Sequence, residues 1–317
     1  MADFPKFVEF REEGPREGFQ IEKTIYPIEQ RAELIEMLGE SGLKRIVVGS
    51  FVSPKYVPQM ADTAELFTRI KRKPGVEYST MWLNEKGFLN ALAAQDAHIN
   101  PMLLYYTSDA FCQRNNNCTM AEMAKRQKGW IDLYRQHGYE VETAGITTAF
   151  GCNFQGEIPL SQVLDVVREL MRLCEETGTK VPTLSIADTM GWANPEAVKR
   201  MIGGIRNLLP DTRIAMHFHD TRGLGIANLY AALEMGIDLF DSAIGGLGGC
   251  PFGGFGNIRA AGNISTEDSV FLCHEMGIET GLDLNRLIAA AQKAEEIIGT
   301  PLMSRVLHSG GLDRFRL

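Results

Sequence analysis

Short apolar, β-rich runs alternate along the whole chain with longer segments of helical pattern. Continuous runs rich in Val, Ile, Phe and Tyr predict strands that are buried on both faces. The segments between them repeat apolar residues every three or four positions, as amphipathic helices do. The expected strands are residues 7–10, 45–51, 76–83, 102–107, 142–149, 183–187, 214–219 and 239–244.

Helices are expected after most of these strands, most clearly at 28–42, 160–177, 195–209, 225–235 and 266–276. Alternating strands and helices predict a parallel sheet, and eight repeats predict closure into a (β/α)₈ TIM barrel. A doubly wound sheet is the structural alternative, although no GxGxxG follows the first strand. We expect residues 1–317 to form a single TIM-barrel catalytic domain, in which residues 289–317 add a short C-terminal helical extension.

Charge and composition narrow the partners. The net charge of −8 argues against binding to nucleic acid or to an anionic membrane surface. No apolar run is long enough to span a membrane, and the first residues lack the pattern of a signal peptide, so a cytoplasmic location is expected. The six cysteines include no CxxC pair, which favours reduced thiols over disulfides or a zinc finger.

The sharpest chemical pattern is the pair His217 and His219 at the end of the seventh expected strand. Side chains two apart share one face of a strand, so both imidazoles are expected to point into the barrel mouth. Two such imidazoles can bind one metal ion at about 2.0–2.2 Å each. A lone His-x-His is equally typical of hydrogen-bonded histidines, but active sites of barrels lie at the C-terminal strand ends, which favours the metal.

The segment GPREG at 14–18 follows the first strand. Taken alone, it is more typical of a turn with solvated charges. A hard cation prefers oxygen ligands, however, and Glu17 can supply a carboxylate. Arg16 can hold a substrate oxygen on which negative charge develops. Because strands one and seven face the same mouth, we expect Glu17 to add to the histidine site.

A glycine-rich segment at 245–257 follows the eighth strand. Glycines let a backbone move or approach a ligand closely, and barrel loops of this kind often act as lids. Cys250 on this loop is a candidate acid or base, although a lone cysteine is more often a small apolar residue. Asn263 can give a neutral oxygen ligand or cap the helix expected near Thr266.

Read together, these segments resemble the 3-hydroxy-3-methylglutaryl-CoA lyases, within a wider group of TIM-barrel metallolyases that also contains isopropylmalate and homocitrate synthases. The resemblance runs from about residue 7 to residue 300. SFVSP…VPQMAD and GGLGGCP are typical of the lyase branch. The matching segments are GPREGFQ (14–20), SFVSPKYVPQMAD (50–62), NEKGF (84–88), residues 111–118, GC (151–152), SIADTMG (185–191), HFHDT (217–221), GGLGGCP (245–251) and GNISTED (262–268).

The resemblance implies a role for each candidate residue. Arg16 would stabilise an enolate-like transition state, and Cys250 would take part in proton transfer. Gln20 and Asp188 would line the site and bind substrate. The implied metal ligands are Glu17, His217, His219 and Asn263.

The implied reaction cleaves a 3-hydroxyacyl-CoA to a ketone or keto acid and acetyl-CoA. A divalent cation would acidify the tertiary hydroxyl, His217 or a neighbouring carboxylate would remove its proton, and Cys250 would protonate the resulting enolate. Mg²⁺ or Mn²⁺ is the expected cofactor, with Zn²⁺ or Co²⁺ as alternatives because this ligand set accepts all four. The expected partners are an acyl-CoA thioester and a second copy of the chain in a homodimer.

Four features depart from the family pattern. Glu17 stands where the family has aspartate, and Val47 where it usually has glutamate; we hypothesise that Glu17 reaches into the space left at Val47. Cys250 and Asn263 are 13 positions apart, a longer interval than expected. Arg222 stands where tyrosine is usual and is expected to bind substrate. A more apolar pocket at Val47 would suit a bulkier or less carboxylated 3-hydroxyacyl-CoA.

Two other functions are compatible with the sequence. The first is an aldolase or Claisen-type condensing enzyme that acts on a CoA-free 2-oxo acid, against which GGLGGCP and the absence of a long C-terminal regulatory region argue. The second is a barrel that has lost its chemistry and serves for binding, which the changes at Glu17 and Val47 would permit. Turnover of free acids compared with thioesters separates the first from a lyase.

Overall fold

The computed structural model describes residues 4–253 and 262–316, which form two compact units. The first unit contains Asn100–Leu239 together with residues 4–5 and 252–253; the second contains Lys6–Ile99, Phe240–Pro251 and residues 262–316. Within the described residues, no helix combines the length and the apolar character that crossing a membrane would require.

Eight strands form one sheet whose order is β3-β2-β1-β10-β9-β8-β5-β4. Neighbouring strands of this sheet are also its successive strands along the chain, except that β1 pairs with β10. This is the strand order of a (β/α)₈ barrel and not of a doubly wound sheet. The pairs β1–β2, β2–β3, β4–β5, β5–β8 and β8–β9 are parallel. The strands are β1 (Glu9–Glu12), β2 (Arg45–Phe51), β3 (Glu77–Trp82), β4 (Met102–Tyr106), β5 (Thr143–Thr147), β8 (Thr183–Asp188), β9 (Arg213–Phe218) and β10 (Leu239–Ser242).

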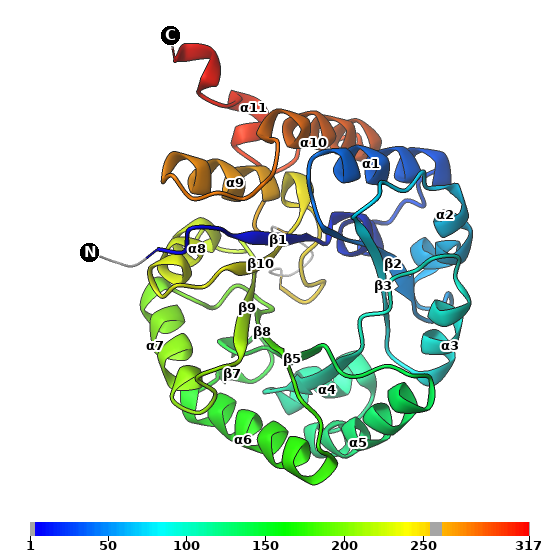
Figure 1. Cartoon of the computed structure of the whole chain (residues 1–317), viewed down its shortest axis with the longest axis vertical. Coiled ribbons are helices and arrows are strands. Elements are labelled where there is room, and N and C mark those ends of the chain that lie inside the picture. Colours follow the sequence, from blue (N-terminus) through cyan, green and yellow to red (C-terminus); the bar gives the residue numbers. More distant parts are fainter. Residues whose placement is uncertain (1–3, 254–261, 317) are drawn as a thin grey trace. The chain divides into compact units, whose positions relative to one another are not determined.

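Helices of the first unit cover its strands in chain order, and in Figure 1 α5, α6 and α7 follow one another along the outer side. The amphipathic α6 buries Val163, Val167 and Leu170, and it packs on α7, which packs on α8. A short antiparallel hairpin, β6 (Gly151–Cys152) and β7 (Gly156–Glu157), follows β5. The helices are α4 (Asp109–Asn116), α5 (Met120–Gln136), α6 (Leu160–Thr177), α7 (Pro195–Arg206) and α8 (Gly225–Glu234).

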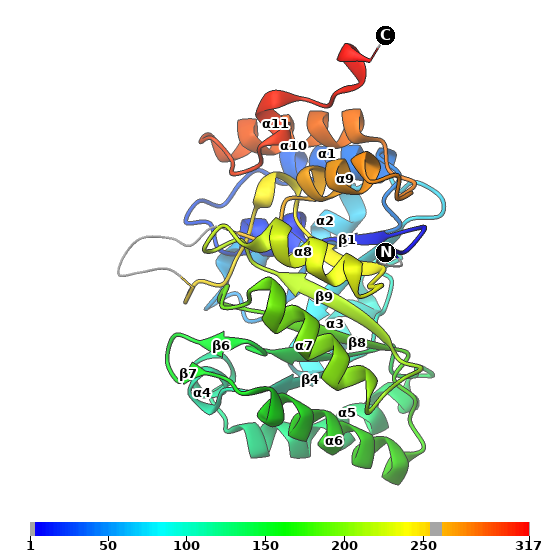
Figure 2. The same cartoon turned by 90° about the vertical axis from the view of Figure 1, so that its left-hand side faces the viewer.

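The second unit joins the beginning of the chain to its end. Helix α1 packs on α10, and α9, α10 and α11 pack against one another (Figure 2). A π-helical turn, Gly14–Gly18, follows β1, and a 3₁₀ turn, Ile244–Gly246, follows β10. Further 3₁₀ turns are Pro58–Met60 and Asp313–Phe315. The helices are α1 (Ile28–Glu40), α2 (Thr63–Arg69), α3 (Glu85–Ala93), α9 (Thr266–Glu275), α10 (Leu284–Ile298) and α11 (Val306–Ser309).

The first strand lies two residues later than expected, at Glu9–Glu12 instead of residues 7–10. The apolar pattern stops at Phe10, but the chain stays extended and buried through Arg11 and Glu12. Burial of Arg11 is possible because its Nε donates to Asp241 Oδ1 at 2.6 Å. Phe10, on the other face, stacks on Phe240 with ring centroids 5.9 Å apart. A buried ion pair therefore extends the strand beyond its apolar residues.

Candidate active site

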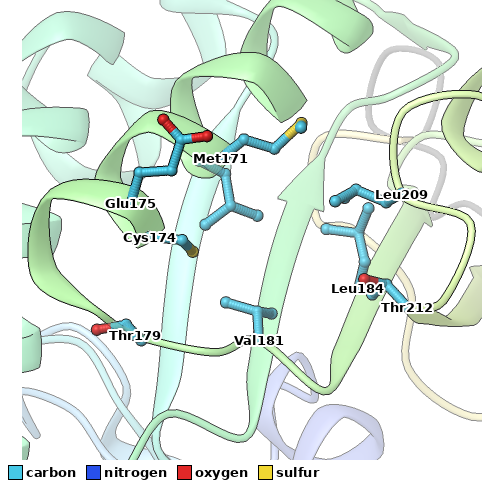
Figure 3. Close-up of a pocket in the computed structure, with 9 residues that line it drawn as sticks. Met171, Cys174, Glu175, Thr179, Val181, Leu184, Leu209 and Thr212 are labelled. Carbon is cyan, nitrogen blue, oxygen red and sulfur yellow. The ribbon is translucent and has the colours of Figure 1, made fainter.

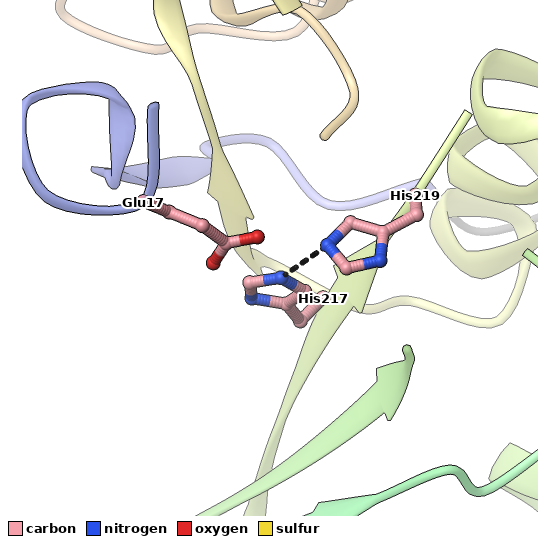
Figure 4. Close-up of side chains that lie close together, drawn as sticks. All are labelled: Glu17, His217 and His219. Carbon is pink, nitrogen blue, oxygen red and sulfur yellow. Dashed lines mark hydrogen bonds between the residues drawn. The ribbon is translucent and has the colours of Figure 1, made fainter. Parts of the chain in front are cut away.

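The two histidines leave the C-terminal end of β9 with their rings turned toward one another. His217 is the penultimate residue of β9, and His219 follows the strand directly. Their Nε2 atoms are 3.2 Å apart (Figure 4), and the rings are nearly perpendicular at 81°. His219 Nδ1 lies 2.6 Å from the carbonyl oxygen of Thr189. Because a carbonyl can only accept, Nδ1 of His219 holds the proton and Nε2 presents its lone pair.

This geometry fits two ligands of one cation. Two nitrogens at about 2.1 Å from a common ion are about 3.0 Å apart at a right angle and about 3.4 Å apart in a tetrahedron. The Nε2–Nε2 distance of 3.2 Å in His217 and His219 lies between these values. Metal-ligating histidines also typically donate their second ring nitrogen to a carbonyl or a carboxylate, as His219 does to Thr189.

Asp188 ends β8 and organises the turn that follows it. Its buried carboxylate accepts from the backbone N–H groups of Trp192, at 2.7 Å, and Ala193, at 3.0 Å. Burial raises the pKa of Asp188 to about 6, although these two donors and the charges of His219 and Arg222 work in the opposite direction. Asp188 thereby shapes the turn that contains the Thr189 carbonyl.

Arg222 ties the segment after β9 to the same turn. Its Nη1 donates to the carbonyl oxygens of Met190, at 2.8 Å, and Gly191, at 2.9 Å. The guanidinium carbon lies 5.8 Å from the centre of the Trp192 ring, a cation–π distance. Arg222 is exposed, so its other donors are available to a charged group outside the protein.

In the second unit, the π-helical turn after β1 presents Glu17 from a buried position. Glu17 Oε1 accepts from the backbone N–H of Gly249 and from Asn263 Nδ2, both at 3.1 Å. Extra π-helical turns are often found at functional sites. Gly248 packs against this pair, since a Cβ there would lie 2.7 Å from Asn263 Nδ2 and 3.0 Å from Glu17 Cγ.

Asn263 is almost fully buried and directs its amide nitrogen to Glu17 and to the carbonyl of Leu247. Its Oδ1 is buried but has no hydrogen-bond partner among the described residues. The first residue of α9 is instead capped by Ser265, whose side chain accepts from Asp268 N, so Asn263 is not the helix cap. A buried carbonyl oxygen without a donor is costly, and a cation would satisfy it.

The first unit offers the imidazole nitrogens of His217 and His219 as candidate metal ligands, and the second unit offers the carboxylate of Glu17. Their ligand atoms are two imidazole nitrogens and a carboxylate oxygen, a donor set that divalent cations accept.

Arg16 is held by carboxylates on two sides. Its Nε and Nη2 donate to Glu13 Oε2, at 2.9 and 2.5 Å, and Nη2 lies 3.2 Å from Glu17 Oε2. Burial disfavours the charged guanidinium, but Glu13 and Glu17 outweigh it and hold the pKa of Arg16 above its usual value. The guanidinium is therefore charged and fixed in direction.

Two buried carboxyl groups join the segments on which these residues lie. Glu12 Oε1 accepts from Gly14 N, which begins the π-helical turn, and from Ile244 N, both at 2.8 Å. Glu267 accepts from Gly245 N at 3.0 and 3.1 Å. Burial raises the pKa of each carboxyl group to about 7. These bonds fasten the turn that contains Arg16 and Glu17 to the start of the glycine-rich loop.

Gln20 follows the π-helical turn after β1, and Cys250 lies in the glycine-rich loop after β10. Gln20 Oε1 accepts from Ser50 Oγ at 3.2 Å, at the end of β2. Cys250 is half-buried and, like the other five cysteines, is not part of a disulfide. The remainder of the expected lid, residues 254–257, lies outside the described residues. Val47 is half-buried in β2, just before an irregularity in its register with β3.

Each unit has cavities beside the ends of its own strands. One of about 490 Å³ in the second unit adjoins the C-terminal ends of β2 and β3 and is lined partly by Phe51 and Asn84. Another of about 230 Å³ in the first unit lies beside α6, at the N-terminal ends of β8 and β9 (Figure 3). Barrel enzymes place their chemistry at the C-terminal ends. This favours the first cavity, and another of about 530 Å³ that follows β5 and is lined partly by Phe150 and Asn194, over the smaller one. The smaller is lined by Leu170, Met171, Cys174, Glu175, Thr179, Val181, Leu184, Leu209 and Thr212.

No role was predicted from the sequence for three residues that contact the candidate site: Glu12, Glu13 and Thr189. Glu13 adjoins the GPREG motif, so its pairing with Arg16 at i+3 could have been anticipated. Glu12 looks like one more exposed charge, because its partner Ile244 is 232 positions away. The Thr189 carbonyl is a backbone group and leaves no mark on residue type.

The chain is similar to several known proteins along nearly its whole length. A 3-hydroxy-3-isohexenylglutaryl-CoA/hydroxymethylglutaryl-CoA lyase of Pseudomonas aeruginosa is 38% identical over 305 residues, covering 96% of this chain and 97% of that protein. The mitochondrial hydroxymethylglutaryl-CoA lyase of Bos taurus is 38% identical over 291 residues, covering 92% and 85%. The structure of an HMG-CoA lyase from Acinetobacter baumannii, in complex with coenzyme A and 3-methylmalate, is 34% identical with a TM-score of 0.87, covering 100% and 99%.

The fold and these relatives together define a (β/α)₈-barrel carbon–carbon lyase. The HMGL-like family model matches residues 8–293, and the chain belongs to this family of hydroxymethylglutaryl-CoA lyase-like enzymes. The lyases of Pseudomonas aeruginosa and Bos taurus each match more than nine-tenths of the chain.

Proposed function

We propose that the enzyme binds one divalent cation through Glu17, His217, His219 and Asn263 and cleaves a 3-hydroxyacyl-CoA to acetyl-CoA and a ketone or keto acid. The observation that supports this best is the His217–His219 pair, whose Nε2 atoms are 3.2 Å apart while His219 Nδ1 is committed to Thr189. The unpartnered Oδ1 of Asn263 beside Glu17 supports the oxygen ligands.

The bound cation would act as a Lewis acid that lowers the pKa of the tertiary hydroxyl of the substrate. His217 or a neighbouring carboxylate removes the hydroxyl proton. The bond between Cα and Cβ of the thioester then breaks, so that the hydroxyl carbon becomes a carbonyl and the electron pair passes to the thioester enolate. Arg16, held in place by Glu13, stabilises the negative oxygen of that enolate. Cys250 donates the proton that completes acetyl-CoA.

The proposed substrate class rests on the apolar side chain of Val47, which is half-buried in β2. An apolar side chain there favours a 3-hydroxyacyl-CoA with a branched substituent that is bulkier or less carboxylated than the usual one. The name of the Pseudomonas relative includes a 3-hydroxy-3-isohexenylglutaryl-CoA, which has such a substituent. Gln20, Asp188 and Arg222 are the proposed polar contacts to the substrate, Asp188 acting through the turn that it organises.

Cofactor, assembly and location complete the proposal. Mg²⁺ or Mn²⁺ is the proposed ion because two of the four ligands are oxygens, with Zn²⁺ and Co²⁺ as alternatives. The enzyme is proposed to be a single-domain barrel that forms a homodimer and works in the cytoplasm, where its free thiols would stay reduced.

The test is turnover of a panel of 3-hydroxy-3-alkylglutaryl-CoA thioesters, with the matching free acids in parallel, in the presence of Mg²⁺ or Mn²⁺. We expect release of acetyl-CoA from thioesters only. Turnover of CoA-free 2-oxo acids instead would favour the aldolase alternative. Metal binding without product from any compound would contradict the lyase proposal.

A matched pair of variants tests the site. Replacing His219 by Ala should abolish metal binding and turnover. His274, in α9, donates or accepts a single hydrogen bond with Thr280 at 2.8 Å, and His274→Ala should leave both unchanged. Equal metal affinity in the two variants would remove His219 from the ligand set.

A further inference from the structure

The glycine-rich loop is held at a point just before Cys250. Gly249 N donates to Glu17 Oε1 at 3.1 Å, and Gly249 has a positive φ of 100°. That conformation is open to glycine and strained for other residues. The backbone on the N-terminal side of Cys250 therefore has one defined position within the second unit.

Two residues after Cys250, Phe252 is docked on a group of aromatic rings in the first unit. Its ring meets Phe154 and Phe111 edge to face, with centroids 5.6 and 6.1 Å away. Phe111 is buried, whereas Phe154 and Phe252 are partly exposed. The guanidinium of Arg114 covers the Phe154 ring at 4.0 Å. Edge-to-face pairs and cation–π contacts of this kind are stabilising in themselves.

The backbone of the docked residues is bound by a single amide side chain. Asn153 Nδ2 donates to the carbonyl oxygen of Phe252 at 2.9 Å, and the carbonyl of Gly253 lies 3.4 Å from the same nitrogen. Because both acceptors are main-chain carbonyls, Asn153 recognises the path of the loop and not a particular side chain. It is also part of the turn of the β6–β7 hairpin.

Trp192 fixes the orientation of that amide. Its indole Nε1 donates to Asn153 Oδ1 at 2.8 Å, so the amide nitrogen must point to the loop. Trp192 N in turn donates to Asp188 Oδ1, and the indole packs where a Cβ on Gly151 would lie 2.4 Å away. A continuous set of contacts thus runs from the turn that Asp188 organises to the loop beyond Cys250.

We propose that Asn153, Trp192 and the aromatic pair Phe111 and Phe154 form a docking site for Phe252, and that this docking positions Cys250 for proton transfer. Phe252 is two residues from Cys250 along the chain, so its docking limits the positions open to the Cys250 backbone. Asn153 and Phe252 are positioning residues, since neither needs to touch the substrate. The inference rests on the proposed role of Cys250 in the lyase reaction.

The test compares the full-length enzyme with its Phe252→Ala and Asn153→Ala variants by two measurements. The first is the rate at which iodoacetamide alkylates Cys250, followed by peptide mass spectrometry with the half-buried Cys174 as internal reference. We expect severalfold faster alkylation of Cys250 and an unchanged rate at Cys174. The second is kinetics: kcat should fall about tenfold or more while KM changes less, because a reacting group has been displaced.

Matched variants separate docking from a general loss of structure. Phe252→Tyr keeps the ring and should retain both the slow alkylation and kcat. Asn207 is an exposed asparagine at the end of α7, so Asn207→Ala removes the same amide elsewhere in the first unit and should have no effect. Unchanged alkylation in Phe252→Ala and Asn153→Ala would overturn the docking site.

Faster alkylation with unchanged kcat would overturn the positioning role. If no thioester is turned over, the lyase proposal fails, but alkylation still decides whether Phe252 is docked. The two failures are therefore distinguishable.

Discussion

At the scale of the residue, Glu12 places a carboxyl group in the protein interior close to the proposed site. Its two oxygens accept from Gly14 N, Ile244 N and the hydroxyl of Thr266. Burial outweighs these three donors and raises the pKa of Glu12 to about 7. The protonated form is therefore favoured in the folded chain over a range of pH in which an exposed glutamate is ionised.

This shift has a defined sign in stability. Between about 4.5 and about 7, the folded chain binds a proton at Glu12 that the unfolded chain has released. The stabilisation that this proton gives the folded chain is fully present below pH 4.5 and is lost as the pH rises through about 7. The loss amounts to about 3 kcal/mol for a shift of this size.

The variant Glu12→Gln should remove that dependence, because glutamine keeps an acceptor for the backbone donors but does not titrate. We expect the unfolding free energies of wild type and variant, measured by urea denaturation between pH 5 and pH 8, to diverge in slope. Glu267→Gln, at a carboxyl group with the same shift, should give a similar difference. Parallel curves for both variants would contradict the assigned pKa values.

The position of a candidate site residue was predictable where a local sequence motif marked it, and its contacts were not. His217 and His219 stand at the strand end that the pattern predicted, with only His219 beyond the last strand residue. The burial of Glu17 against Gly249 and Asn263 could not be foreseen, because these contacts span 232 and 246 positions. Interactions that join distant segments leave no local signal.

At the scale of the element, predictions succeeded where periodicity was long. Arg45–Phe51 and Leu160–Thr177 have the bounds expected from the sequence. The hairpin of Gly151–Cys152 and Gly156–Glu157 was not predicted, since strands of two residues show no alternation. The turn Gly14–Gly18 is π-helical, a conformation that the sequence GPREG does not predict.

The turn at Gly248 makes a second prediction. Gly248 has a φ of 88°, and an added Cβ would meet Asn263 Nδ2 at 2.7 Å. Gly248→Ala should therefore displace Asn263 and Glu17 and weaken metal affinity by about tenfold or more, measured by titration calorimetry. It should also destabilise the fold by about 1–2 kcal/mol, the strain of alanine in a left-handed conformation.

Gly223 provides the control, since its φ is 73° but nothing lies within 4 Å of an added Cβ. Gly223→Ala should show the same backbone strain with unchanged metal affinity. If both variants bind metal as the wild type does, the close packing of Gly248 has no part in the site.

At the scale of the whole molecule, the proposed ligands come from both units and from segments spread over most of the chain. An ion that binds only the folded chain stabilises it by mass action, by about 2.7 kcal/mol at one hundred times its Kd. We expect the melting temperature to rise with the logarithm of Mn²⁺ concentration, as followed by calorimetry. In His219→Ala the rise should vanish, and in His274→Ala it should persist.

The hydrogen bonds that Glu12 accepts from Gly14 N and Ile244 N have a consequence for folding during synthesis. The first strand leaves the ribosome early. Its hydrogen-bond partners are synthesised much later: Ile244 N donates to Glu12, and the Glu279 carbonyl accepts from Val8 N. At usual rates of translation, this delay is on the order of tens of seconds. A nascent chain must therefore keep β1 and the turn with Arg16 and Glu17 unfinished until synthesis is almost complete, and a chain that stops short of Ile244 cannot assemble this half of its site.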